Sequence, residues 1–513
     1  MTADDASASG DPAELQRLEE AMARVMPALE SFLRFEQADR SMIDRPIWQA
    51  ALDRPLPRDG AGLDVVLDEL ATHVIPNGLR NAQPGFSAYI VGRPTTAALA
   101  ASLSAHVAGH VRYFLTSFNF LEQLSLDWLA EMCGVPSGHT GVYSGGGSTA
   151  NLLAMGAARQ AAFEALGVDP AADGVAAAPI SHIYGSREVH HTIHRAAGVL
   201  GLGRRAFVEI ASDVAGRLDP EALDRRLEGD RRAGVLPIAV IAVAGSTGTG
   251  AIDRIDAIAD VAARHGVWLH VDGAYGLPAA ALPELQDAFR GLERADSLIV
   301  DPHKWLGTPV GCGATYVRDG ALLHRAFRQE PAPYLEVQAP TEARSQFDDQ
   351  GALWYEQTIE LTAPSRGVWV WATIREVGLE GMRTRLRRHI GFARHVADMA
   401  AAHPLLQLML PAELSICCFR YRPSSEGEAD LDALNEEIVR RLRAETPFVP
   451  SMTVVDGALA IRPCFVNAGT TLADVEGLVQ AVVDIGDRLC ARGAPGRGER
   501  DGRIMASTPR GVA

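Results

Sequence analysis

The sequence predicts an α/β protein whose large domain is a mostly parallel sheet covered by helices. Short apolar runs at 237–243, 267–271 and 297–300 lack polar alternation, as expected of strands that are buried on both faces. An amphipathic helical stretch at 255–265 separates the first two runs, which gives a βαβ unit. The chain has 513 residues, more than one ordinary domain holds, so smaller parts are expected beside the large one.

Changes in composition along the chain predict five parts. Residues 1–12 are polar and acidic and are expected to be disordered. Residues 13–95 form an N-terminal helical segment with proline-rich breaks, too thin to bury its own core, so we expect it to pack on something larger, such as a second subunit. The large domain covers 96–372, and a small α+β domain covers 373–492. The tail, 493–513, is rich in Gly, Arg and Pro and is expected to be disordered.

The overall charge and the cysteine pattern exclude several classes of protein. A net charge of −16 and a pI of about 5.4 argue against a nucleic-acid footprint and against binding to anionic membranes. No apolar run reaches the roughly 20 residues of a transmembrane helix, and the N-terminus lacks a signal-peptide layout. The six cysteines form no C-x-x-C pair, so we expect core packing and a reduced, cytoplasmic setting.

The first candidate site segment is the glycine-rich stretch 144–151, which leads into a predicted helix. Glycines at a helix start let backbone N–H groups approach a phosphate, and the helix dipole favours the anion. Gly147 and Ser148 are the candidate ligands. The alternative is that the stretch is only a tight turn, since it matches neither a Walker A loop nor the G-x-G-x-x-G pattern in a βαβ context.

The second segment, 270–276, places a carboxylate at the end of a buried strand. Asp272 can pair with a pyridinium nitrogen, and the small Ala274 lets a flat ring lie close by. The alternative is an aspartate that caps the next helix. Ligands of open α/β sheets bind outside the carboxyl ends of the strands, but on this segment alone the helix-cap alternative is slightly favoured.

The third segment is 301–305, Asp-Pro-His-Lys-Trp. Lys304, between His303 and Trp305, follows a buried strand and would occupy a desolvated pocket suited to Schiff-base chemistry. A solvated surface lysine is the alternative. The basic residues are almost all arginine, which cannot form a Schiff base, so a lysine here points to amine chemistry.

The fourth segment, 189–195, holds three histidines. His190 and His194 share a helix face at i, i+4, a spacing that can bind metal, but the glutamate of H-E-x-x-H is absent. The rival interpretation is an imidazole stacked on a cofactor ring. For His191 and His194 an ordinary surface or core histidine is favoured, and no metal site is predicted.

Taken in order, these four segments resemble the fold-type I pyridoxal-5′-phosphate (PLP) enzymes. More narrowly they are similar to the group II amino-acid decarboxylases, the family of the aromatic-L-amino-acid, glutamate and cysteine-sulfinate decarboxylases. The resemblance covers about 63–486 and is most specific at 270–275 and 302–305. It implies a large domain with a mostly parallel seven-stranded sheet and a homodimer with its active site at the subunit interface.

The resemblance also implies a role for each candidate residue. Lys304 would carry PLP covalently, and Asp272 would pair with the pyridine nitrogen. His190 would stack on one face of the ring and Ala274 would line the other. Gly147, Ser148 and Thr247 would hold the phosphate, and Asp301 and His303 would flank the site.

The segment 330–335 resembles the family's mobile catalytic loop, in which Tyr334 would donate a proton to the substrate carbanion, with His190 as the alternative donor. The implied reaction is decarboxylation of an L-amino acid, with an aromatic one as first choice, to an amine and CO₂. Acidic and aliphatic amino acids stay open as substrates. Three rival hypotheses are an aldehyde synthase, whose hallmark is Phe in place of Tyr334, a different PLP reaction such as β-elimination or transamination, and a non-catalytic PLP-binding protein.

The sequence departs from the family pattern at several positions. Gly273 replaces the usual Ala, and Asp301 stands where the aromatic branch often has Asn. The substrate-entry segment 88–96 aligns with the dopa-type decarboxylases of the family only with a gap. The segment 466–471 lacks the Arg that the family often has just before the threonines. Arg93 and Arg366 could each bind a second substrate carboxylate, and a surface or structural role is the alternative for both.

Overall fold

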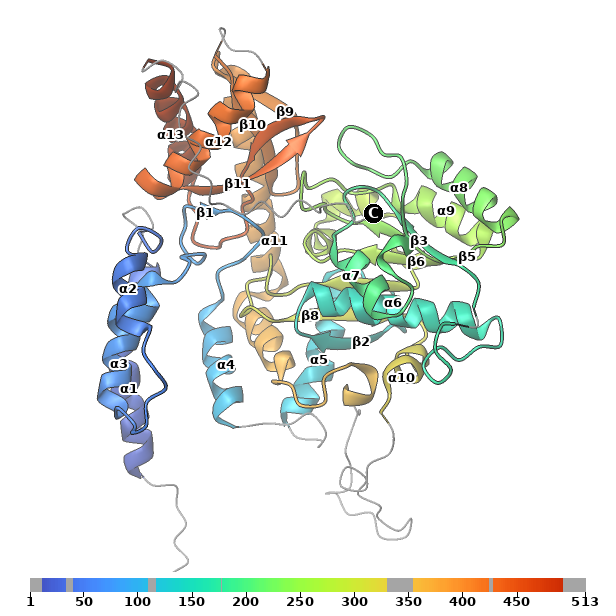
Figure 1. The fold of residues 1–513 in the computed structure, drawn as a ribbon, viewed down its shortest axis with the longest axis horizontal. Coiled ribbons are helices and arrows are strands. Elements are labelled where there is room, and N and C mark those ends of the chain that lie inside the picture. Colours follow the sequence, from blue (N-terminus) through green and yellow to red (C-terminus); the bar gives the residue numbers. More distant parts are fainter. Residues whose placement is uncertain are drawn as a thin grey trace, which may run out of the picture.

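The computed structural model describes residues 12–33, 40–108, 117–176, 178–329, 354–423 and 428–491. In Figure 1 they form a column of N-terminal helices, a large α/β part and a smaller part that lies beside the large one. None of the helices within these ranges is both long and apolar enough to cross a membrane.

The large part contains a seven-stranded sheet with the order β2-β8-β7-β6-β5-β3-β4. Strands β3 to β7 are parallel to one another, and β8 is antiparallel to β2 and β7. The predicted α/β class with a mostly parallel sheet is therefore confirmed. The strands are β2 (Thr140–Ser144), β3 (Ser181–Gly185), β4 (Phe207–Glu209), β5 (Leu236–Val243), β6 (Trp268–Asp272), β7 (Ser297–Val300) and β8 (Gly313–Val317).

The central strands are apolar along their length because both faces of the sheet are covered. In β5, Ile241 and Val243 belong to one apolar cluster, and Val240 and Ala242 belong to another. This alternation gives the sheet a core on each side. The surrounding helices are α5 (Ser117–Met132), α6 (Gly147–Glu164), α7 (Thr192–Val199), α8 (Pro220–Arg232), α9 (Ile255–His265), α10 (Ala321–Phe327) and α11 (Arg366–Ala402).

The smaller part contains a five-stranded sheet with the order β1-β11-β12-β10-β9. Its strand β1 comes from the N-terminal segment and pairs in parallel with β11. Two residues carry no strand signal in a sequence, which is why 13–95 was predicted as helical throughout. The elements are β1 (Phe86–Ser87), β9 (Leu406–Glu413), β10 (Ile416–Tyr421), β11 (Val449–Val455), β12 (Ala458–Arg462), α12 (Glu428–Glu445) and α13 (Leu472–Ala491).

Helix α11 connects the two parts and contains the domain boundary predicted at 372/373. The helix bends at Gly378, whose φ of 69° and ψ of 167° interrupt the helical backbone. The first half of α11 lies against α4 (Thr96–Val107) and α5, and the second half lies against β9 and β10. The domain bounds themselves remain a prediction.

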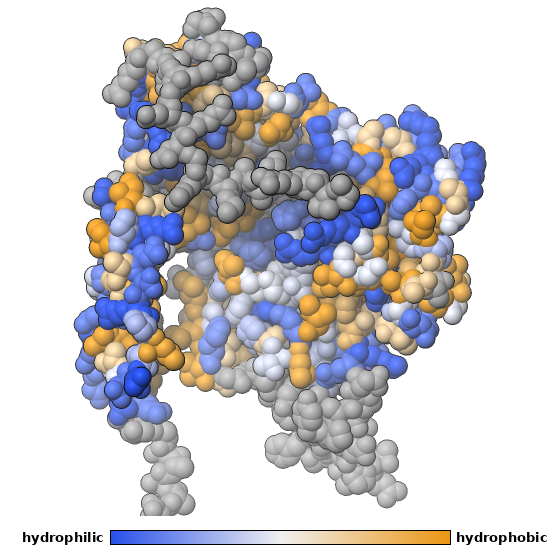
Figure 2. All heavy atoms as spheres, viewed as in Figure 1, coloured by the Kyte–Doolittle hydropathy of each residue, from blue (hydrophilic) through white to orange (hydrophobic). Residues whose placement is uncertain are grey.

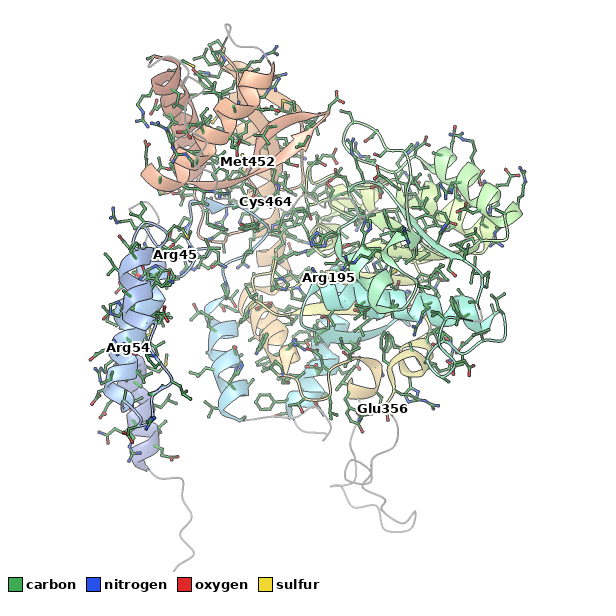
Figure 3. The ribbon with its side chains drawn as sticks, viewed as in Figure 1. Arg45, Arg54, Arg195, Glu356, Met452 and Cys464 are labelled. Carbon is green, nitrogen blue, oxygen red and sulfur yellow. The ribbon has the colours of Figure 1, made fainter. Side chains whose placement is uncertain are left out.

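The N-terminal column consists of α1 (Pro12–Leu33), α2 (Arg45–Leu52) and α3 (Leu63–Glu69). It stands apart from the rest of the chain, with α4 between it and the large part (Figure 1). Several of its apolar side chains face solvent, among them Ile47 at 67% and Leu56 at 92% exposure. Apolar residues accordingly lie on its surface in Figure 2. Figure 3 labels Arg45 and Arg54 on the same column, and Arg54 pairs with Glu69 at 3.0 Å.

A buried hydrogen-bond chain ties the large part to the smaller one and to the N-terminal segment. The indole Nε1 of Trp305 donates to Nδ1 of His389 at 3.0 Å, and Nε2 of His389 donates to the carbonyl of Asn467 at 3.1 Å. The amide of Asn467 donates in turn to the carbonyls of Ala82 and Gln83. His389 is neutral in this arrangement, since one ring nitrogen accepts and the other donates.

We expect the free energy of unfolding to fall as the pH drops below about 6.5. Burial lowers the pKa of His389 to about 3 and that of His270, on β6, to about 4. The unfolded chain takes up these protons near pH 6.5 and the folded chain does not, so each histidine costs roughly 1.4 kcal/mol per pH unit within this window. Urea unfolding between pH 7.5 and 5 measures the slope. His389→Gln should flatten it, and an unchanged slope in the variant would contradict the assignment.

Candidate active site

One cavity of about 260 Å³ opens at the carboxyl ends of β5 and β6 and at the start of α6. Every residue that the sequence proposed for the site lines it, apart from Tyr334, which lies outside the described residues. The lining consists of Gly145, Gly146, Gly147, Ser148, Asn151, Glu188, His190, Val243, Gly245, Thr247, Asp272, Ala274, Tyr275, Asp301, His303 and Lys304.

The glycine-rich turn before α6 forms one end of this cavity. Gly146 has a φ of 122°, which favours glycine, and the helix begins at Gly147. A Cβ on Gly147 would lie 2.6 Å from Oδ2 of Asp301, and one on Gly146 would lie 3.2 Å from the ring of His303. The backbone therefore needs glycine at both positions to approach these side chains. The free N–H groups of the first helical turn can bind an anion here.

Asp272 lies at the opposite side of the cavity, as the last residue of β6. Its Oδ2 accepts a hydrogen bond from the amide of Asn151 at 3.1 Å, and its Oδ1 accepts one from the backbone N–H of Ala274 at 3.2 Å. Both donors support a carboxylate in its ionised form. The helix-cap alternative is not what the structure shows: within the described part of the chain the backbone N–H on this side chain is that of Ala274, and the next helical element, a short 3₁₀ turn, begins at Leu277.

His190 precedes α7, which begins at Thr192, so the prediction that His190 and His194 share a helix face was wrong. Nδ1 of His190 lies 2.9 Å from the hydroxyl of Thr192, and its ring centroid is 4.2 Å from that of His191. Burial lowers the pKa of His190, which favours the neutral ring. His194 packs on Phe207 instead, with 4.3 Å between ring centroids. Among the described residues no cluster of three or more His, Cys, Asp or Glu could hold a metal ion.

Lys304 is the only lysine in the 513-residue chain. Its side chain is 19% exposed, and its Nζ lies 3.1 Å from Oδ2 of Asp301, which is 1% exposed. The surface-lysine alternative is therefore wrong. The other oxygen of Asp301, Oδ1, has no hydrogen-bond partner among the described residues. Gly92 of the substrate-entry segment lies so close to the carbonyl of Lys304 that a Cβ there would collide with it.

Two further supports fix the floor of the site. Trp305 is fully buried and stacks on Tyr275 with 5.0 Å between ring centroids, and the Tyr275 hydroxyl bonds to Ser415 of the smaller part. Thr247 accepts a hydrogen bond at its carbonyl from Arg462, a buried arginine on β12. The smaller part therefore supports two residues that line the cavity, Thr247 and Tyr275. Cys464 of the smaller part, labelled in Figure 3, donates its backbone N–H to the carbonyl of Ser87 in the N-terminal segment.

Sequence reasoning did not assign roles to Asn151 or Glu188. Asn151 lies one helical turn after Ser148, on the face of α6 that meets β6, a position that helical spacing could have indicated. Burial raises the pKa of Glu188, in the loop after β3. Its Oε1 lies 3.9 Å from Nε of the neighbouring Arg187. No local pattern marks that glutamate, because its burial depends on the loop that carries Thr247.

The two arginines considered for substrate binding lie elsewhere. Arg366 is buried and makes a bidentate pair with Glu360 at 2.8 and 2.9 Å, so its guanidinium is already occupied. Arg93 is half-buried, and a Cβ on Gly469 would lie 3.1 Å from its Nη1. Neither lines the cavity.

The model of the pyridoxal-dependent decarboxylase conserved domain matches residues 48–422. The chain belongs to the pyridoxal-dependent decarboxylase family. An aromatic-L-amino-acid decarboxylase of Bacillus atrophaeus is 29% identical over 84% of this chain and 87% of its own length. A phenylacetaldehyde synthase of a Rosa hybrid cultivar is 27% identical over 83% of this chain and 84% of its own length. The crystal structure of Oryza sativa TDC with PLP and tryptamine has a TM-score of 0.82 at 26% identity, covering 94% of this chain and 99% of that one.

The donor set of the cavity fits the cofactor of this family. One end offers a helix N-terminus, the Ser148 hydroxyl and His303 to an anion, and the other offers the Asp272 carboxylate to a protonated ring nitrogen. A single amine, Lys304, lies in the same cavity as both. The residues of the pyridoxal-dependent decarboxylase therefore have the chemistry and the order that PLP requires.

Gly147→Ala should weaken the binding of PLP about tenfold or more. Its Cβ would press on the buried Asp301 carboxylate, and such overpacking costs about 1–3 kcal/mol. Titration of the cofactor-free protein, followed by visible absorbance, measures the change. Gly229→Ala in α8, where a Cβ meets nothing within 4 Å, is the matched control and should bind PLP normally. Equal affinity in both variants would rule out this account of the turn.

Proposed function

We propose that the chain removes the α-carboxyl group of an L-amino acid, most readily an aromatic one, to give an amine and CO₂. The observation that carries the proposal is that the only lysine of the chain shares one cavity with Asp272 and an anion-binding helix start. The aromatic choice is supported by the Bacillus atrophaeus relative, which is named for aromatic amino acids. Acidic and aliphatic amino acids remain open as substrates, and CO₂ release measured over the twenty amino acids separates them.

In this proposal bound PLP supplies a sink for the electron pair that the departing CO₂ leaves behind. Lys304 is the residue that would hold the cofactor covalently. Asp272, with Asn151 and the Ala274 N–H on its oxygens, would keep the ring nitrogen protonated. His190 and Ala274 would line the two faces of the ring.

The remaining roles concern the anion and the final proton. Gly147, Ser148 and Thr247 would hold the phosphate group, and His303 would flank the site. Asp301 keeps a counter-charge beside Lys304. Tyr334 returns a proton to the carbon that has lost CO₂. This last role stands on the family resemblance, since Tyr334 lies outside the described residues.

The proposed assembly is a homodimer with the active site at the subunit interface. The exposed apolar side chains of the N-terminal column support it, because a column with few contacts to its own chain needs another surface to cover it. A second copy of the chain is the occupant that we propose. Sedimentation should give twice the 54.8 kDa chain mass, and a monomer at micromolar concentration would contradict the dimer.

A cytoplasmic location is proposed as well. The six cysteines are free, and five of them are buried as thiols in the apolar interior. Free thiols are typical of proteins that function in a reducing compartment.

Lys304→Ala should abolish both the visible absorbance of the bound cofactor and amine formation. Borohydride reduction of the loaded wild-type protein should attach the cofactor to one peptide, because no other side-chain amine exists. Lys304→Arg is the matched control, since it keeps the charge beside Asp301 but cannot form the imine. A reduced adduct in either variant, read by mass spectrometry, would remove Lys304 from the proposal.

Tyr334 decides between the amine and the aldehyde as product. The similarity to a phenylacetaldehyde synthase makes aldehyde formation the second candidate function. Tyr334→Phe removes the proposed proton donor, so in aerated buffer product should shift from amine towards aldehyde while PLP stays bound, with O₂ as the oxidant and with ammonia and hydrogen peroxide released beside CO₂. Chromatography of both products from one reaction gives the ratio. An unchanged ratio would exclude Tyr334 as the donor.

A further inference from the structure

Asn151 connects Asp272 with Thr192, whose hydroxyl contacts His190. It is 2% exposed, and its Nδ2 donates to Oδ2 of Asp272 at 3.1 Å and to the hydroxyl of Thr192 at 3.3 Å. Its Oδ1 lies 2.9 Å from Nε2 of His270. Both N–H donors and one of the two acceptor lone pairs of this amide are therefore in use.

The chain of hydrogen bonds continues away from the cavity. Nδ1 of His270 lies 2.8 Å from the hydroxyl of Ser297, and the indole Nε1 of Trp268 donates to the same hydroxyl at 2.8 Å. His270 and Ser297 are fully buried. Because Trp268 is the first residue of β6 and Asp272 the last, the chain runs the length of that strand.

The two ends of this chain fix its direction. An indole can only donate, and an ionised carboxylate can only accept. The carboxylate of Asp272 therefore requires the NH₂ side of Asn151, which leaves the amide oxygen for His270. Nε2 of His270 must then carry a proton and donate it, while Nδ1 accepts the hydroxyl proton of Ser297. Burial lowers the pKa of His270 to about 4, in agreement with this neutral ring.

The same argument sets the state of His190. The Thr192 hydroxyl accepts a hydrogen bond from Asn151, so its own proton is free to be donated to Nδ1 of His190 at 2.9 Å. The backbone N–H of Thr192 also points at this nitrogen, at 3.4 Å. Nδ1 of His190 is thus an acceptor, and in the neutral ring the proton sits on Nε2.

We propose that Asn151, Thr192, His270 and Ser297 are positioning residues that hold His190 as a neutral ring with its proton on Nε2. A ring in that state lies against the cofactor but has no free nitrogen to accept a proton and no surplus proton to give. His190 therefore takes no part in proton transfer to the substrate carbon. This inference rests on the proposed placement of PLP between His190 and Ala274.

The charges around His190 come from several elements. Asp272 on β6 and Asp301 after β7 favour the charged ring, and Lys304 and the neighbouring His191 oppose it. Burial adds to the opposition and is the largest of these effects. The Thr192 hydroxyl is the group that can be removed without changing any of these charges.

Thr192→Val tests the near end of the chain. Valine keeps the shape but leaves Nδ1 of His190 without its hydroxyl donor, so the ring can take up a proton. We expect a new step in the pH titration of the bound cofactor's visible absorbance and about a tenfold loss of PLP affinity. Thr192→Ser restores the hydroxyl and should behave like the wild type. If Val and Ser variants titrate alike, the assignment of His190 is overturned.

Ser297→Ala tests the far end, which does not line the cavity. Loss of the Ser297 hydroxyl leaves Nδ1 of His270 without its donor, so His270 no longer enforces the orientation of the Asn151 amide. The affinity for PLP should therefore fall several-fold. Thr315→Val on β8 is the matched control: it too loses a buried hydroxyl, one that bonds only the Ala150 carbonyl at 3.1 Å among the described residues. It should lower the thermal midpoint without changing the cofactor titration. Equal cofactor titrations for both variants would overturn the proposal.

These readouts do not depend on turnover. A chain that bound PLP but released no CO₂ would contradict the proposed function and still report the cofactor titrations. A chain that decarboxylates normally but shows no difference between the Thr192 variants would contradict the inference alone.

Discussion

The hydrogen bond from Asn151 to Asp272 joins the two elements on which the site depends. Asp272 ends β6, and Asn151 lies in the first turns of α6, whose N-terminus forms the anion end of the cavity. The distance between Asp272, the proposed partner of the ring nitrogen, and the helix start that is proposed to bind the phosphate is thus set by how α6 packs on the sheet. A buried carboxylate without that amide would lose one of its two donors and the support for its charge. The packing of α6 on the sheet therefore also sets the geometry of the proposed cofactor site.

A large share of the fold could be predicted because parallel strands leave a strong signal. The run at 297–300 coincides with β7, and the helix predicted at 255–265 coincides with α9. Strands buried on both faces must be apolar throughout, and a helix between them must be amphipathic, so little else fits such a pattern. Strand β1, with two residues, has no such signal, since its pairing with β11 depends on a partner more than 350 residues away.

The grouping of the candidate residues followed from a topological rule, since strand ends of a parallel sheet share one edge. What the sequence could not provide was the orientation of side chains in loops. His190 and His194 have helical spacing, yet His190 lies before the helix begins and the two point to different neighbours. The burial of Glu188 and the ion pair of Arg366 could not be predicted from local sequence either, because the burial of a charged group depends on how the folded chain surrounds it.

The small part contributes to the site through supports rather than through reacting groups. Arg462 holds the carbonyl of Thr247, and the chain from Trp305 through His389 reaches the carbonyl of Asn467. The N-terminal segment adds Gly92, whose lack of a side chain lets it lie on the backbone of Lys304. The smaller part, through His389 and Trp305, and the N-terminal segment, through Gly92, therefore both contact the backbone region that carries Lys304.

Asp301 is the departure from the family pattern for which the geometry gives a reason. The Lys304 side chain is 19% exposed, and Oδ2 of the buried Asp301 lies 3.1 Å from its Nζ, where a carboxylate can serve as its ion-pair partner. An asparagine there would leave the only lysine of the chain without that partner. The same carboxylate lies beneath Gly147, at the positive end of α6, where a helix start stabilises an anion. Asp301 thus shares its surroundings with the anion that the cavity is built to hold, and its balance with Lys304 keeps that end of the site from carrying an unpaired charge.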